Sequence, residues 1–225
     1  MTAGDRGCVV IGSGPSLKAI DIASLAGVDT VAFNQSYVAW DDWGFAPTYY
    51  CAFDPNGVED HAADLRAALA RFTSTRAFLN DIAGTIGFES SPRIRFVRVL
   101  GEPEFRVSVD EVGDFGNVGA SSLQVIAALG YRRVALVGID GRYTPGNAVE
   151  ELQRNYFSPA YVTPGRWYSP DPATSLQQWD RAAAGCRRAG LEVRNASPGT
   201  ALECFPKTDL AGALNWVRGD QPVRA

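Results

Sequence analysis

Short apolar segments that alternate with helical segments are the feature that most limits how this chain can fold. Strand-like runs are expected at residues 8–11, 30–33, 49–53, 77–79, 95–99, 134–138 and 191–193, and helices at 17–25, 58–72, 121–129, 175–189 and 210–217. Strands that are apolar throughout and alternate with helices are typical of a parallel sheet whose two faces are both covered. The sequence therefore predicts an α/β fold, with a Rossmann-like, doubly wound, mainly parallel sheet and helices on both faces.

Length and composition agree with one folded domain. The chain has 225 residues, of which 46% are hydrophobic and 20% charged. These fractions are close to the average for soluble globular proteins, so a full core can form. A length of 225 residues permits two domains but does not require them. We expect a single nucleotide-binding domain over residues 1–225.

The charge balance and the cysteines narrow the classes of partner and compartment. There are 21 Lys and Arg against 25 Asp and Glu, which disfavours a nucleic-acid partner. No run approaches the roughly 20 apolar residues of a membrane span, and the start MTAGDRG lacks the pattern of a signal peptide. The four cysteines are scattered without a C-x-x-C pair, which fits a reducing compartment. We therefore expect no transmembrane segment and a cytoplasmic location.

The sequence lacks the residues that several kinds of metal site and phosphate site require. His61 is the only histidine, so one chain cannot build a multi-histidine metal site, and the surrounding EDHAADLRAAL predicts a solvated position on a helix. The chain has no G-x-x-x-x-G-K-[ST] loop. It also has no Asp-x-Asp pair, which many nucleotide-sugar enzymes use to hold a divalent ion. We expect no resident metal.

A glycine-rich loop, formed by Gly12, Ser13, Gly14, Pro15 and Ser16, joins the first strand to a helical segment. Glycines let backbone N–H groups approach an anion, and the start of a helix carries partial positive charge. Proline suits the first helical turn. The loop predicts a phosphate or nucleotide cradle, or else a tight turn that needs glycine for geometry alone. Leu17 replaces the third glycine of the dinucleotide fingerprint, which argues against NAD.

Polar residues also follow three other strands, where ligands bind in open α/β sheets. They are Asn34 with Gln35, Asp54, and Asp140. The Asn34 amide suits recognition of a phosphate, ribose or base, although Asn is also favoured in turns. Asp140 has three possible roles: anchoring a lid, binding a cation, or acting as a general base.

An irregular segment of 31 residues, 141–171, interrupts the alternation. It carries six aromatic residues, Tyr143, Tyr156, Phe157, Tyr161, Trp167 and Tyr168, and four prolines. Long irregular connections are usually functional lids or disordered, and disordered segments are poor in aromatic residues. We therefore predict an aromatic-rich lid insertion over a bound ligand. The alternative is that these aromatic residues only pack.

Two sets of motifs resemble known families. The stretch VIGSGPSLKAID at 10–21, followed by FNQSY at 33–37, resembles the opening of the small bacterial CMP-sialic-acid-dependent sialyltransferases. Gly119, AALGY at 127–131 and VGID at 137–140 are similar to their second nucleotide-contacting half. NYFSPAY at 155–161 and NASPGTALECFP at 195–206 look more like the 6-hydroxymethylpterin diphosphokinase MptE-like family.

The resemblance implies a nucleotide donor held between the glycine-rich loop and residues 119–140. The nucleotide-binding residues would be Gly12, Ser13, Gly14, Pro15, Ser16, Asn34, Gln35, Asp54, Gly119, Ala120 and Gly138. In the sialyltransferases CMP is displaced without a metal, lid tyrosines support the leaving phosphate, and a lid histidine deprotonates the acceptor.

This chain departs from that pattern because its lid has no histidine, and Tyr156 stands in that place. A tyrosine with a pKa near ~10 is a poor base at neutral pH. The catalytic candidates are Asp140, Tyr143, Tyr156 and Tyr161. Asp171 is a further candidate for the base.

Three functions remain open from the sequence. The first is a metal-independent glycosyltransferase that uses a nucleotide-activated sugar, with a CMP-sugar as the preferred donor, and a small-molecule or glycan acceptor. The second is a Mg²⁺-dependent diphosphokinase that moves pyrophosphate from ATP to a small alcohol such as a pterin, with Asp54 and Asp140 holding the ion at neighbouring strand ends. The third is a non-catalytic nucleotide-binding module. No cofactor is expected except Mg²⁺ in the second case, and the sialyltransferase resemblance implies a homo-oligomer.

Overall fold

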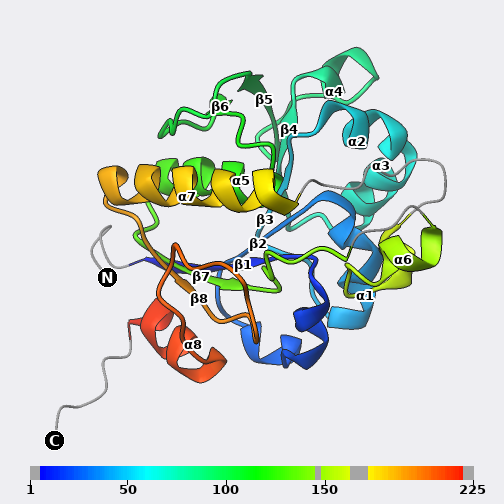
Figure 1. The fold of residues 1–225 in the computed structure, drawn as a ribbon. Helices are drawn as coiled ribbons and strands as arrows, with labels where there is room; N and C mark the ends of the chain where they lie inside the picture. The colour runs from blue at the N-terminus through cyan, green and yellow to red at the C-terminus, as the bar shows by residue number, and fades with distance from the viewer. Residues whose placement is uncertain (1–5, 145–147, 163–171, 220–225) are drawn as a thin grey trace, which may run out of the picture.

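The computed structural model describes residues 6–144, 148–162 and 172–219 (Figure 1). Their strands form one sheet in the order β6-β5-β4-β3-β2-β1-β7-β8, and every neighbouring pair is parallel. The strands are β1 (Gly7–Ile11), β2 (Thr30–Phe33), β3 (Tyr49–Ala52), β4 (Arg76–Asn80), β5 (Ile94–Leu100), β6 (Glu111–Gly113), β7 (Arg133–Val137) and β8 (Glu192–Asn195). The predicted Rossmann-like α/β class is confirmed.

Two helices cover one face of the sheet. They are α5 (Val118–Ala128) and α7 (Pro172–Ala189), and their Leu123 and Trp179 share one core with Val10 and Cys51 of the strands. β1, β2, β3 and β7 are apolar on both sides because side chains alternate between the two faces and both faces are covered.

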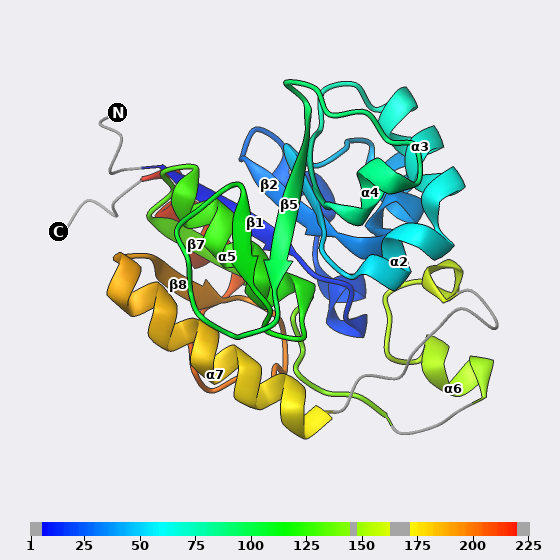
Figure 2. The same ribbon diagram turned by 90° about the horizontal axis from the view of Figure 1, so that it is seen from above.

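The opposite face carries two further groups of helices. The 3₁₀ helices η2 (Pro15–Ala19) and η3 (Ile22–Leu25) and the last helix, α8 (Leu210–Arg218), cover β1 and β7. Helices α2 (Pro55–Asp60), α3 (Ala62–Arg71) and α4 (Ile82–Thr85) cover β3 and β4. Figure 2 shows α2, α3 and α4 on one side of β5, and α5 and α7 on the other.

Three local expectations were wrong. The helix expected at 17–25 is the pair of short 3₁₀ helices η2 and η3. The helix expected at 58–72 begins earlier, at Pro55, and is broken at His61. Strand β6 was not anticipated, because its three residues include only one large apolar side chain, Val112.

Short helices follow β2 and occur within the predicted lid. They are η4 (Asn34–Ala39), α1 (Trp40–Trp43), α6 (Val149–Gln153) and η5 (Pro159–Tyr161). The lid residues Trp167, Tyr168 and Asp171 lie outside the described residues. Within the described ranges, none of the helices combines the length and the apolar character needed to cross a membrane.

Candidate functional site

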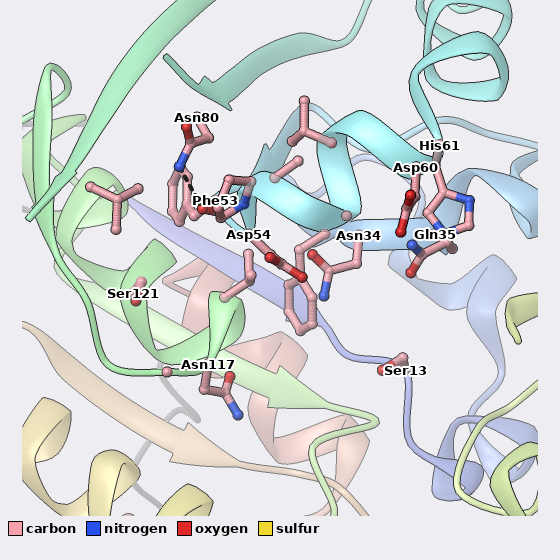
Figure 3. A pocket seen from close by; sticks show the side chains of 18 of the residues that line it. Ser13, Asn34, Gln35, Phe53, Asp54, Asp60, His61, Asn80, Asn117 and Ser121 are labelled. Carbon is pink, nitrogen blue, oxygen red and sulfur yellow. Dashed lines mark hydrogen bonds between the residues drawn. The ribbon is translucent and has the colours of Figure 1, made fainter. Parts of the chain in front are cut away.

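A cavity of about 550 Å³ lies at the carboxyl ends of β2 to β5, beside the glycine-rich loop (Figure 3). Its walls come from the segments that follow these strands, from the start of α5, and from the lid. The polar side chains in its lining are Ser13, Asn34, Gln35, Tyr37, Tyr50, Asp54, Asp60, His61, Asn80, Asp114, Asn117, Ser121, Tyr143, Tyr156, Tyr161 and Ser175. The place agrees with the rule that open α/β sheets bind ligands beyond the carboxyl ends of their strands.

Asn34 enters this cavity with an unusual backbone conformation. Its φ is +52°, and among the described residues no other side-chain-bearing residue has a positive φ. Asn tolerates this left-handed region better than most residues do. The Tyr50 hydroxyl donates a hydrogen bond to the Asn34 carbonyl over 2.7 Å, which stabilises the turn. The sharp turn places the Asn34 and Gln35 side chains in the cavity wall, and Asp54 joins them from the end of β3.

The glycine-rich loop is closed against the segment that follows β7. The Gly12 amide donates to the Val137 carbonyl over 2.7 Å, and the Gly14 amide donates to the Gly138 carbonyl over 2.8 Å. A Cβ atom on Gly12 would stand 2.3 Å from the Gly138 oxygen. The close contact of the two segments therefore explains why the loop needs its glycines.

Ser16 completes this closure with Asp140. The Ser16 amide donates to Asp140 Oδ2 over 2.9 Å, and the Ser16 hydroxyl donates to Oδ1. Three amides expected to cradle an anion thus already donate to protein oxygens. Of the five loop residues, Ser13 lines the large cavity. Ser13 and Gly14 also line a small hollow of about 50 Å³, together with Gly138 and Asp140 of the segment after β7. A ligand-binding role for Gly12, Pro15 and Ser16 stays a prediction.

Asp54 and Asp140 are not at neighbouring strand ends. Asp54 follows β3 and Asp140 follows β7, and β2 and β1 lie between these strands. Asp54 Oδ1 instead accepts the Asn56 amide over 3.1 Å and caps α2. The expectation that these two aspartates follow neighbouring strands is therefore wrong.

The start of α5 opens into the cavity. Asn117 precedes the helix, and its Oδ1 accepts the Ala120 amide over 3.2 Å. The amides of Val118 and Gly119, in the first helical turn, precede the residues that can bond within the helix. Gly119 packs against Phe33 and Ala120 is fully buried, so the cavity wall is made by Asn117, Val118 and Ser121. Sequence reasoning missed Asn117, although an Asn before a helix is a known capping signal.

The structure brings three predicted lid tyrosines, Tyr143, Tyr156 and Tyr161, to one wall. The rings of Tyr156 and Tyr161 stack with their centroids 4.7 Å apart. The Tyr161 hydroxyl bonds to Ser13 and Asn34, and Tyr143 bonds to Ser175. Burial raises the pKa of both Tyr143 and Tyr161 above the usual value. These side chains are therefore phenols, which can donate a hydrogen bond, and not phenolates.

The lone histidine is not where the sequence placed it. His61 was expected in solvent, but it is only 5% exposed and lines the cavity. α2 ends at Asp60, and His61 has φ −113° and ψ 18°, which lie outside the helical range. Because the helix breaks there, the imidazole lies in the wall and not on the outer surface. Figure 3 shows it beside Asp60 and near Gln35.

Comparison with solved structures supports the fold of this site. The MAf glycosyltransferase from Magnetospirillum magneticum AMB-1 is similar with a TM-score of 0.60 at 15% identity, over 96% of this chain and 37% of that one. The chain thus spans little more than a third of the length of that enzyme. No protein-family model matches the sequence, and no curated protein does.

Two smaller enzymes share the fold over most of their length. The monofunctional α-2,3-sialyltransferase Cst-I from Campylobacter jejuni is similar with a TM-score of 0.57 at 13% identity, over 92% of this chain and 81% of that one. An α-2,3-sialyltransferase from Campylobacter jejuni in its apo form gives 0.53 at 14% identity, with the same coverage. At these identities the likeness is one of fold.

Proposed function

We propose that the chain transfers a sugar from a nucleotide-activated donor, most favourably a CMP-sugar, to a hydroxyl acceptor. The observation that carries the proposal is the large polar cavity at the carboxyl ends of the strands, between the start of α5 and the lid tyrosines. The solved structures that share the fold include glycosyltransferases and sialyltransferases, which supports the same reaction class.

The donor phosphate is assigned to the start of α5. A helix of 11 residues presents partial positive charge at its first turn. The amides of Val118 and Gly119 and the Asn117 side chain supply donors there. Asn34 and Asp54, which lie between this point and the far end of the cavity, suit the hydroxyls of the donor.

The leaving group is assigned to the lid tyrosines. When the bond between the anomeric carbon and the phosphate oxygen breaks, negative charge grows on the phosphate. A phenol placed beforehand can stabilise this charge by donating a hydrogen bond. Tyr143 and Tyr161 remain protonated because burial raises the pKa of each. In this proposal Tyr143 and Tyr161 donate to the leaving phosphate, and no metal takes part.

Ligand-dependent stability tests the donor. CMP, UMP, GDP, ADP and ATP are compared in thermal unfolding with and without Mg²⁺, and CMP is expected to stabilise in both conditions. A ligand at 100 times its Kd adds about 2.7 kcal/mol to the free energy of unfolding. Asn117→Ala should weaken CMP binding, and Asn215→Ala, on the exposed side of α8, is the matched control.

The outcomes separate the three functions. Hydrolysis of a CMP-sugar that survives EDTA supports glycosyl transfer. Failure to bind both CMP and a CMP-sugar in calorimetry contradicts the proposal. Strict dependence on Mg²⁺ and ATP selects the diphosphokinase instead, and CMP binding without any turnover of a CMP-sugar selects a binding module.

A further inference from the structure

The far end of the cavity, away from α5, has its own set of polar side chains. Figure 3 shows Gln35, Asp60 and His61 at this end, whereas Asn80 and Ser121 lie at the other. Tyr37 of η4 lines the same cavity. We call the wall formed by Gln35, Tyr37, Asp60 and His61 the η4–α2 end.

Two buried polar atoms of this wall have no hydrogen-bond partner within the described ranges of the chain. They are Oε1 of Gln35, whose residue is only 6% exposed, and the hydroxyl of Tyr37. A buried polar group left without a partner is destabilising, because it has lost its hydrogen bonds to water. Both residues line the cavity, so a ligand there can supply the missing partners. The amide oxygen accepts a hydrogen bond and the phenol donates one, which matches a hydroxyl-rich molecule such as a sugar.

His61 supplies the proton acceptor that such a ligand needs. A ring nitrogen of an imidazole can accept the proton of a hydroxyl that hydrogen-bonds to it. Burial raises the pKa of Tyr37 and Tyr161, which removes both as bases. Asp140 is bonded to Ser16, and Asp54 caps α2.

Charged and titratable groups from three elements adjoin this wall. Asp60 precedes His61 on α2, and Asp64 of α3 and Tyr161 of η5 interact electrostatically with Tyr37.

We propose that the η4–α2 end binds the acceptor sugar and that His61 is its general base. This inference rests on the proposed glycosyl transfer. The acceptor O–H bond breaks and its proton passes to a ring nitrogen of His61. The acceptor oxygen bonds to the anomeric carbon of the donor, and the bond from that carbon to the phosphate oxygen breaks with its electron pair. The nucleotide leaves as an anion, and the imidazolium then releases its proton to solvent.

The first test is kinetic. Water serves as the acceptor, and the turnover of a CMP-sugar is measured in the full chain. A general base contributes a factor of about 10²–10⁴, so His61→Gln should lower kcat by at least 100-fold while the Kd for CMP stays unchanged. In the native protein kcat/KM should fall on acidification, as expected for a general base that must be unprotonated, and His61→Gln should lose this dependence. Glu59→Gln, on the exposed side of α2, is the control expected to leave turnover unchanged.

A chemical rescue separates catalysis from structure. Imidazole added to His61→Ala should restore turnover, which a purely structural role would not produce. If His61→Gln hydrolyses the CMP-sugar as fast as the native chain, the role of His61 as base is overturned. If the native chain neither binds CMP nor turns over a CMP-sugar, it is the proposed function that fails.

The acceptor subsite has a test that needs no activity. Because the chain has a single histidine, the Hε1 proton of its imidazole gives one signal that can be assigned without ambiguity in a proton NMR spectrum. A panel of methyl hexopyranosides is titrated against the native chain and Gln35→Leu. We expect a saturable shift of the signal in the native chain and a dissociation constant at least fivefold weaker in Gln35→Leu. A signal that no member of the panel moves, or that moves equally in both proteins, overturns the subsite.

Discussion

The carboxylate of Asp140 bonds to the backbone amide of Ser16, with 2.9 Å between Oδ2 and the nitrogen. The Ser16 hydroxyl donates to the same carboxylate. Ser16 follows β1 and Asp140 follows β7. These strands are neighbours, and the strand order reverses between them, because β2 to β6 lie on one side of β1 whereas β7 and β8 lie on the other. In this fold a protein carboxylate therefore occupies the start of η2, where many α/β proteins place the phosphate of a ligand.

Removal of this carboxylate should destabilise the chain. A hydrogen bond to a charged group contributes about 1.5–3 kcal/mol, so Asp140→Ala should lower the free energy of unfolding by about 2 kcal/mol. Ser16→Ala removes the hydroxyl partner, and the double variant should lose less than the sum of the two. Urea unfolding of the four proteins measures the coupling. Strictly additive losses would show that the contact contributes nothing.

The glycines of the loop should tolerate no side chain. A Cβ atom would stand 2.3 Å from the Gly138 oxygen in Gly12→Ala and 2.7 Å from the Asp140 carboxyl carbon in Gly14→Ala. Overpacking of this kind costs about 1–3 kcal/mol. Gly101→Ala is the matched control, because its Cβ would meet nothing within 4 Å. Denaturant midpoints of the three variants measure the difference, and equal midpoints would contradict the close contact of the two segments.

Asn34 offers a way to separate stability from binding. Its φ of +52° costs a residue such as alanine about 1–2 kcal/mol, whereas glycine adopts it freely. Asn34→Ala should therefore unfold at a lower urea concentration than Asn34→Gly. Both variants lose the carboxamide in the cavity and should bind CMP equally weakly. Tight CMP binding by Asn34→Gly would show that the side chain does not contact the donor.

Alkaline pH should weaken the fold through its four cysteines, because burial raises the pKa of each thiol above its ordinary value. Burial raises the pKa of Cys204 to about 11 and that of Cys186 to about 12, from an ordinary value of 9.0. Above pH 9 the unfolded thiols lose protons while the folded ones keep them. The unfolded state then binds fewer protons, so the free energy of unfolding falls as the pH rises from 9 towards 11 and 12.

This pH dependence can be assigned to single residues. Urea unfolding at pH 8, 9, 9.5 and 10 gives the slope, and Cys204→Ala should reduce it. The window ends at pH 10 because the buried tyrosines, whose pKa values are also raised, add to the slope above it. An unchanged slope in Cys204→Ala would mean that this thiol ionises equally in both states.

The sheet could be predicted because its strands are apolar on both sides, a pattern that few other structures produce. Val10 and Leu136, for example, lie beside each other in fully buried neighbouring strands. β6 escaped prediction because an edge strand of three residues shows no periodicity. The break at His61 escaped because the Asp54-Pro55 pair, read as the end of a strand, in fact starts α2 and shifts the helix towards the N-terminus.

Part of the cavity lining could be predicted by one rule. Polar residues after apolar strands led to Asn34, Gln35 and Asp54, and the structure brings all three into one cavity. The same rule applies to Asn80 at the end of β4, which was missed. In the structure its side-chain amide donates a hydrogen bond to the Phe53 carbonyl over 2.8 Å. The rule could not show that the amides of the glycine-rich loop donate to the end of β7 and the segment after it. That contact depends on β1 and β7 being neighbours in the sheet.

The contacts of the glycine-rich loop after β1 also bear on how a similar sequence in another chain is interpreted. A sequence that resembles a phosphate-binding loop here joins the two halves of the sheet through hydrogen bonds. These contacts are made between protein atoms alone, so they join β1 to β7 whatever the cavity binds. Substitutions in the residues that follow β2, β3 and β4 can therefore change the cavity wall without removing the contacts between the loop and the segment after β7.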